Sequence, residues 1–297
     1  MSITSSFSGD PSPVTVDIRQ LSLAYGNKPV LQNLSWQLPA GQVVGLLGRN
    51  GAGKTTLLEA MLGLRDQASG QIQLFGEDVA SLSDAARARI GYVPQQSNLF
   101  EWMTPSQLLA YFKSFYPRWN DAKVEGLLSR WAIDRHQPIS QLSGGQQQRL
   151  SIIRALGHEP DLLVLDEPVA SLDPAGRRDF LQELVSQVID RQTTVVFSTH
   201  ILSDLERVAF NVAFMGAGRI VLQAPLDELM EGARSITGST VAVRQQAQAQ
   251  GWQVLCETPL SDGRLRVLAR GGVADSAAPG AAVDAVTLED LFLGLTQ

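Results

Sequence analysis

The spacing of apolar residues changes several times along this chain of 297 residues, and each spacing predicts a different element. Apolar and polar residues alternate through residues 14–38, around a turn at Gly26-Asn27. This alternation predicts two or three antiparallel strands. A short apolar run at residues 43–47 then leads into a glycine-rich turn and a helical pattern. The first part of the chain is therefore predicted to be a β-rich region followed by a strand, a loop and a helix.

The middle of the chain combines further strands with a mainly helical stretch. Residues 70–80 and 89–94 are predicted to be strands, and residues 104–155 have helical spacing interrupted by proline and glycine. Apolar or β-branched runs at 162–165 and 194–198 are bounded by chain breakers, and a helical pattern follows each. Such runs are typical of parallel strands that are buried on both faces. The alternation of strands and helices predicts an α/β fold.

The two ends of the chain differ from this middle part. The first residues are polar and predict a tail rather than a signal peptide, because no basic residue precedes Arg19 and no apolar segment follows. After residue 225, three short segments within 240–270 alternate apolar and polar residues, 271–282 resembles a linker, and 288–295 predicts a short helix. We therefore expect a polar tail at 1–13, an α/β domain at 14–225 with a helical subdomain at about 97–155, and an accessory region at 226–297.

Composition narrows the class of protein. The formal net charge is −6, so the basic balance that favours nucleic-acid binding is absent and no nucleic-acid partner is expected. The single cysteine, Cys256, excludes an intrachain disulfide and suits a reducing cytosol. No stretch approaches the ~18 apolar residues of a membrane-spanning helix. A membrane role would therefore need another protein.

A phosphate-binding loop follows the strand at 43–47. The segment GRNGAGKT at 48–55 fits the spacing G-x-x-x-x-G-K-[ST] at Gly48, Gly53, Lys54 and Thr55. Glycines let backbone N–H groups surround phosphate oxygens, and the positive end of the following helix points toward the anion. Lys54 is predicted to contact the β- and γ-phosphates, and the Thr55 hydroxyl to bind Mg²⁺.

Two acids follow the apolar run at 162–165. A strand that ends in Asp166-Glu167 places both carboxylates at the edge of the sheet where α/β proteins bind ligands. Asp166 suits a Mg²⁺-linked carboxylate, and Glu167 suits a base that activates water. A solvated strand end is the alternative interpretation, and the phosphate loop favours the functional one.

Two more strand ends carry polar residues that suit the same γ-phosphate. Gln95 follows the strand at 89–94 and is a candidate for holding Mg²⁺ or the attacking water, while His200 follows the strand at 194–198. The segment LSGGQ at 142–146 forms a second anion-binding helix start, because Ser143 is a good N-cap and two glycines allow close approach. One nucleotide does not need two such loops from one chain.

These residues resemble the ATP-binding-cassette (ABC) ATPases over roughly residues 14–225. GRNGAGKT resembles the Walker A motif, LSGGQ the signature motif, LLVLDEP at 162–168 the Walker B motif, and Ser171-Leu172-Asp173 the D-loop. Gln95 and His200 resemble the Q-loop and switch residues. Tyr25 is placed like the aromatic residue that stacks on adenine, although a strand tyrosine also serves in packing.

The resemblance implies a P-loop ABC ATPase with a RecA-like core, an antiparallel β subdomain and a helical signature subdomain. It implies ATP and Mg²⁺ as cofactors, with Glu167, His200 and Gln95 as catalytic residues and Thr55, Gln95 and Asp166 as Mg²⁺ ligands. It further implies a head-to-tail dimer, in which the signature loop of one copy closes over the nucleotide of the other. The implied nucleotide contacts are Tyr25, Gly48, Asn50, Gly51, Gly53, Lys54, Thr55, Thr56, Ser143, Gly144, Gly145, Gln146 and Asp173.

Seven aromatic residues stand close together after the Q-loop, within residues 100–119. Exposed aromatic residues on a domain mark interfaces, whereas helical spacing also suits the subdomain's own core, and both interpretations remain open. The seven are Phe100, Trp102, Tyr111, Phe112, Phe115, Tyr116 and Trp119.

The leading hypothesis is a transport ATPase that powers a separate membrane permease, as a homodimer or with a paralogous ATPase. Details such as Phe115-Tyr-Pro-Arg-Trp119 resemble the YtrB-like exporter branch. Such a subunit is expected in the cytoplasm, on the inner face of the cell membrane. The alternative is a soluble ABC ATPase that acts on a ribosome or a nucleic-acid machine. A P-loop kinase is disfavoured because kinases do not need LSGGQ.

Overall fold

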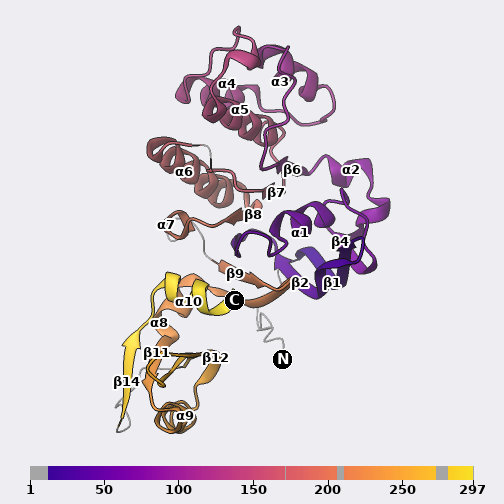
Figure 1. Ribbon diagram of the computed structural model, residues 1–297. Helices are drawn as coiled ribbons and strands as arrows, with labels where there is room; N and C mark the ends of the chain where they lie inside the picture. Colours follow the sequence, from indigo (N-terminus) through magenta and orange to yellow (C-terminus); the bar gives the residue numbers. More distant parts are fainter. Residues whose placement is uncertain (1–12, 171, 206–210, 272–279, 297) are drawn as a thin grey trace.

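The computed structural model describes residues 13–170, 172–205, 211–271 and 280–296 (Figure 1). Residues 1–12 of the predicted tail, Ser171 and most of the predicted linker lie outside these residues. In the described part of the chain, the strands form three sheets. None of the helices described there is both long enough and apolar enough to span a bilayer.

The first sheet is antiparallel and has the order β2-β1-β4-β5. Strands β1 (Val14–Tyr25) and β2 (Lys28–Pro39) pair through a tight turn, which brings Tyr25 opposite Lys28. Gly26 in this turn has a φ of 59°, a backbone conformation that glycine adopts at little cost. The remaining strands are β4 (Ser69–Leu74) and β5 (Glu77–Asp78). The antiparallel subdomain predicted from the alternating pattern is confirmed.

The second sheet has the order β10-β9-β3-β8-β7-β6 and forms the core of the molecule. Strands β3, β6, β7, β8 and β9 run parallel to one another, and β10 is antiparallel to β9. The apolar runs become strands that are buried on both faces, as expected of a parallel sheet. The strands are β3 (Val43–Leu47), β6 (Ile90–Val93), β7 (Leu162–Leu165), β8 (Thr194–Thr199), β9 (Asn211–Gly216) and β10 (Arg219–Pro225).

The helices around this core fall into two groups. Helices α3 (Pro105–Lys113), α4 (Asp121–Arg130) and α5 (Gly144–Leu156) gather at the end of the molecule beyond β6, as Figure 1 shows. They form the helical stretch that the sequence predicted. The other helices near the core sheet are α1 (Lys54–Met61), α2 (Asp84–Arg87), α6 (Pro174–Arg191) and α7 (Leu202–Leu205).

The third sheet lies at the opposite end of the molecule and is antiparallel, with the order β12-β13-β11-β14 (Figure 1). Helix α9 packs on one face of this sheet, and α10 contacts both β12 and the core strand β9. The elements are α8 (Leu226–Gly232), β11 (Ala233–Gly238), α9 (Thr240–Ala249), β12 (Gln253–Pro259), β13 (Leu265–Arg270), β14 (Ala281–Ala285) and α10 (Leu288–Leu295).

One alternating segment does not form a strand. Residues 239–245 alternate apolar and polar residues, yet Thr240 onward is helix α9. Ser239 caps this helix by accepting a hydrogen bond from the backbone N–H of Ala242, and Val243 and Ala247 pack one turn apart in the core of the third sheet. The cap and this spacing outweigh the short alternation.

Candidate functional site

The phosphate loop connects the buried strand β3 to helix α1. Gly51 and Gly53 have φ values of 82° and 101°, in the region that favours glycine. A Cβ at Gly48 would lie 2.8 Å from the backbone oxygen of Met215, so glycine is also needed there for close packing. Gly51 and Gly53 are therefore required by the backbone conformation of the loop, and Gly48 by its close packing against Met215.

Lys54 begins α1, and its side chain is buried inside the loop. Its Nζ donates a hydrogen bond to the Gly48 carbonyl at 2.7 Å and lies 3.6 Å from Oε1 of Glu167. Both side chains of this ion pair are less than 10% exposed. A buried ammonium that is paired at this long distance favours an additional anion nearby.

A chain of hydrogen bonds joins the loop to the ends of β7 and β8. The Thr55 hydroxyl donates to Oδ2 of Asp166 at 2.7 Å, and the Ser198 hydroxyl donates to Oδ1 of the same carboxylate at 2.6 Å. Ser198 also accepts a hydrogen bond of 2.8 Å from the backbone N–H of Glu167. The strand ends are thus fixed to one another and to the phosphate loop.

Glu167 lies between two basic side chains. Its Oε2 is 2.7 Å from Nδ1 of His200, and its Oε1 faces Lys54. The backbone of Glu167 has a φ of 48°, which is uncommon for a residue other than glycine. Such strain persists only where the surroundings hold it, and it is often found at functional sites. The Glu167 side chain therefore lies beside the phosphate loop, held between Lys54 and His200.

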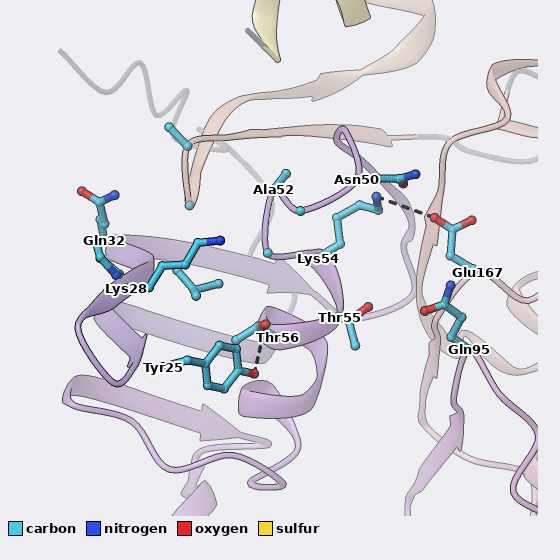
Figure 2. Close-up of a pocket in the computed structure, with 16 residues that line it drawn as sticks. Tyr25, Lys28, Gln32, Asn50, Ala52, Lys54, Thr55, Thr56, Gln95 and Glu167 are labelled. Carbon is cyan, nitrogen blue, oxygen red and sulfur yellow. Dashed lines mark hydrogen bonds and ion pairs between the residues drawn. The ribbon is translucent and has the colours of Figure 1, made fainter.

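An open pocket of about 540 Å³ extends from the phosphate loop along the first sheet. Figure 2 shows Lys54, Glu167 and Gln95 at one end of it and Tyr25 at the other. The Tyr25 hydroxyl is 3.3 Å from the Thr56 hydroxyl, so the ring is tied to α1. The pocket is lined by Tyr25, Lys28, Pro29, Val30, Gln32, Asn50, Gly51, Ala52, Gly53, Lys54, Thr55, Thr56, Gln95, Glu167, Ala217 and Gly218.

Sequence reasoning missed several of these residues. Lys28 and Gln32 come from β2, and Ala217 and Gly218 from the turn between β9 and β10. The backbone N–H of Gln32 donates to the Gly218 carbonyl at 3.1 Å, which joins these two segments. In the sequence, Lys28 stands directly after the turn that follows Tyr25. That position is a signal by which Lys28 could have been identified as part of the pocket lining.

The signature segment lies apart from this pocket. Ser143 caps α5 by accepting a hydrogen bond from the backbone N–H of Gln146, whose side chain accepts one from the N–H of Ser143. Ser143 and Gly144 are exposed, and a Cβ at Gly144 would meet open space. Gly145 follows in the first turn. The start of α5 is therefore exposed and does not line the pocket at the phosphate loop.

Asp173 links the D-loop to the signature helix. Its Oδ1 accepts hydrogen bonds of 3.1 Å from both the Arg149 guanidinium on α5 and the backbone N–H of Gly176. The carboxylate is largely exposed. Asp173 is therefore an exposed carboxylate at the start of α6 that is fixed to helix α5 by Arg149.

The aromatic residues at 100–119 divide between surface and core. Phe100, Trp102, Tyr111 and Phe115 are exposed, whereas Phe112 and Trp119 pack against the main core. Rings of the exposed group stack on one another and on Phe112. The core interpretation is therefore confirmed for the packed rings, and the interface interpretation stays a prediction for the exposed ones.

Comparison with known proteins defines the family. The ABC transporter family model matches residues 31–170. Nod factor export ATP-binding protein I of Rhizobium meliloti (strain 1021) is 34% identical over 230 residues, which cover 75% of this chain and 68% of that protein. The uncharacterized ABC transporter ATP-binding protein YxlF of Bacillus subtilis (strain 168) is 34% identical over 242 residues, covering 80% and 79%. A solved structure of the ATP-binding subunit of an ABC transporter has a TM-score of 0.66 at 28% identity, covering 72% of this chain and 91% of that one.

The chain belongs to the ATP-binding proteins of ABC transporters. It is an ATP-binding and ATP-hydrolysing subunit of such a transporter, and the mixed α/β fold predicted from the sequence is confirmed. The phosphate loop and the acids at the end of β7 both lie within the part of the chain that the family model matches.

Proposed function

We propose that this chain hydrolyses ATP at the described pocket to drive export through a separate membrane permease. The observation that carries the proposal is the position of the Glu167 carboxylate, which faces Lys54 on one side and His200 on the other. Glu167 accepts a proton from the attacking water, while His200 orients that carboxylate and contacts the γ-phosphate. Lys54 and the backbone of the loop hold the phosphates, and the Tyr25 ring stacks on the base.

The donor set at the strand ends suits Mg²⁺ bound together with the nucleotide. Thr55 Oγ1 and Asp166 Oδ2 are 2.7 Å apart, close to the ~3 Å between neighbouring ligands of an octahedral Mg²⁺. Protein sites commonly hold Mg²⁺ through one or two carboxylates and the substrate phosphates. Thr55, Asp166 and Gln95 would hold the ion, which when bound neutralises phosphate charge.

The exposed signature segment supports a head-to-tail dimer. Ser143, Gly144, Gly145 and Gln146 begin helix α5, and Ser143 and Gly144 are exposed there. The capping box uses the N–H groups of Ser143 and Gln146, so the N–H groups of Gly144 and Gly145 are the ones suited to an anion. In the dimer they close over the γ-phosphate held by the other copy, and Asp173 meets that copy across the interface. The second copy is the same chain or a paralogous ATPase.

The permease is the second partner, and it places the subunit on the cytoplasmic side of the cell membrane. Export is supported by the family relative named for Nod factor export, and the aromatic segment supports the narrower YtrB-like branch. We assign residues 14–225 to the ATPase domain, residues 97–155 to its helical subdomain and residues 226–297 to an accessory region. The exposed rings at 100–119 form the docking surface for the permease.

Replacement of Glu167 by glutamine tests this proposal. Glutamine preserves the shape of the side chain but cannot take the proton, so ATP turnover should fall by at least ~100-fold. ATP binding should persist, and sizing chromatography with Mg²⁺ and ATP should show a stable dimer. Glu231→Gln, which alters a carboxylate on α8, is the matched control and should retain wild-type turnover. Persistent turnover in Glu167→Gln would place the base elsewhere.

A further inference from the structure

Arg65 lies over the aromatic ring of Tyr25, which lines one end of the pocket. Its guanidinium carbon is 5.8 Å from the centroid of the Tyr25 ring. Its Nε donates a hydrogen bond of 2.8 Å to Oε2 of Glu59. Glu59 belongs to α1, the helix that begins at the phosphate loop, and Arg65 belongs to the segment that follows this helix. The ion pair therefore joins that segment to α1.

The Tyr25 ring is held at two points by the same part of the chain. Thr56, in the first turn of α1, meets the hydroxyl, and Arg65, beyond the last turn, lies over the ring. Tyr25 is 47% exposed, so these two contacts add to a packing that covers only about half of the residue. Tyr25 lines the pocket, whereas Arg65 is not among the lining residues.

We propose that Arg65, held in place by Glu59, is a positioning residue that fixes the Tyr25 ring as the platform for the base of the nucleotide. The inference rests on the proposed role of Tyr25 and extends it to residues that do not line the pocket. A cation over the face of an aromatic ring attracts its π electrons, and the pairing with Glu59 restricts the guanidinium to that place. The base then meets a ring that is already oriented, so less conformational freedom is lost on binding.

Arg65→Ala should raise the KM for ATP by about two- to fivefold, the range that an exposed cation–π contact provides. The kcat should stay at the wild-type value, because Arg65 does not touch Glu167 or the phosphate loop. Arg65→Lys keeps a cation and should restore part of the loss, while Glu59→Ala should shift KM in the same direction as Arg65→Ala. Arg264→Ala is the matched control, since Arg264 makes a similar Nε hydrogen bond to Asp262 at 2.7 Å on the accessory hairpin.

Inorganic tripolyphosphate separates a role at the base from a role at the phosphates. It competes with ATP for the phosphate loop but carries no base, so its inhibition constant should be the same in Arg65→Ala and in the wild type. In a Tyr25→Ala background, Arg65→Ala should raise KM no further. Both results together would establish that Arg65 acts through the ring.

Three results would overturn the inference about Arg65 while leaving the platform role of Tyr25 in place. The first is an unchanged KM in Arg65→Ala while Tyr25→Ala raises it, and the second is an equal loss of tripolyphosphate inhibition. The third is a full additional effect of Arg65→Ala in the Tyr25→Ala background. An unchanged KM in Tyr25→Ala alone would instead refute the platform role of Tyr25, and the role of Arg65 with it, while leaving hydrolysis by Glu167 in place.

Discussion

The Ser198 hydroxyl donates a hydrogen bond of 2.6 Å to Oδ1 of Asp166, and both side chains are buried. The same hydroxyl accepts the backbone N–H of Glu167, whose φ of 48° needs external support. One serine at the end of β8 therefore aligns both acids at the end of β7.

Ser198→Ala should lower both stability and turnover. The Glu167 N–H would lose its partner in a buried place, which costs about 1–3 kcal/mol of unfolding free energy. Misalignment of the carboxylate should reduce kcat by about 10- to 100-fold. Denaturant unfolding and steady-state ATP hydrolysis measure the two effects, with the exposed Ser140→Ala as control. A wild-type kcat in Ser198→Ala would contradict this role.

Gly218→Ala should damage the wall of the nucleotide pocket. A Cβ at this position would lie 2.1 Å from the Val30 carbonyl oxygen, and the φ of 72° is itself unfavourable for alanine. We expect a several-fold higher KM for ATP and a lower melting temperature. Gly263→Ala is a matched control, because Gly263 has a φ of 81° but faces open space. If both variants behave alike, backbone conformation alone explains the effect and the close approach to Val30 is unimportant.

His158 should make the protein less stable in acid. The pKa of His158 is lowered to about 4, mainly by burial and also by the nearby charges of Arg118 and Arg154, against the opposing effect of the Ile90 carbonyl. The unfolded chain takes up a proton near pH 6.5, whereas the folded protein does so only near its lower pKa. Unfolding free energy should therefore fall as the pH drops from about 6.5 to about 4, by up to ~3 kcal/mol.

The pH dependence of His158→Gln provides the measurement. Glutamine does not titrate, so the stability difference between wild type and variant should shrink as the pH falls, while other groups contribute equally to both. Denaturant unfolding at several pH values between 7 and 4 would show this. A constant difference across that range would mean that His158 is protonated equally in both states.

The exposed rings of the helical subdomain should decide assembly with the permease. Phe100→Ala combined with Trp102→Ala should weaken co-purification of the membrane subunit several-fold, because desolvated aromatic residues contribute most of the energy of such interfaces. The side chains are 40% and 75% exposed, so folding should be unaffected. Leu293→Ala removes a similarly exposed apolar side chain from α10 and serves as control. Unchanged assembly would place the docking surface elsewhere.

The sequence by itself determined the fold class and the parts of the site whose chemistry is local. The phosphate loop is recognisable because Gly48, Gly53 and Lys54 must stand at set distances along the chain to surround a phosphate. Asp166 and Glu167 are recognisable because they end an apolar run, and such runs form the buried strands of a parallel sheet. Periodicity also predicted the helices near 104–155, apart from the exact positions of their ends.

Only the tertiary structure decided which distant residues share the site. Ser198 is one polar residue among several at the end of β8, and its bonds to the neighbouring strand depend on sheet order, which spacing does not reveal. Gly218 reaches Val30 because β10 packs beside β2. The alternating segment at 239–245 became helix α9 because a cap and a buried face outweighed a short local pattern. In each case the deciding energy comes from contacts between segments far apart in the chain, and no local pattern encodes those contacts.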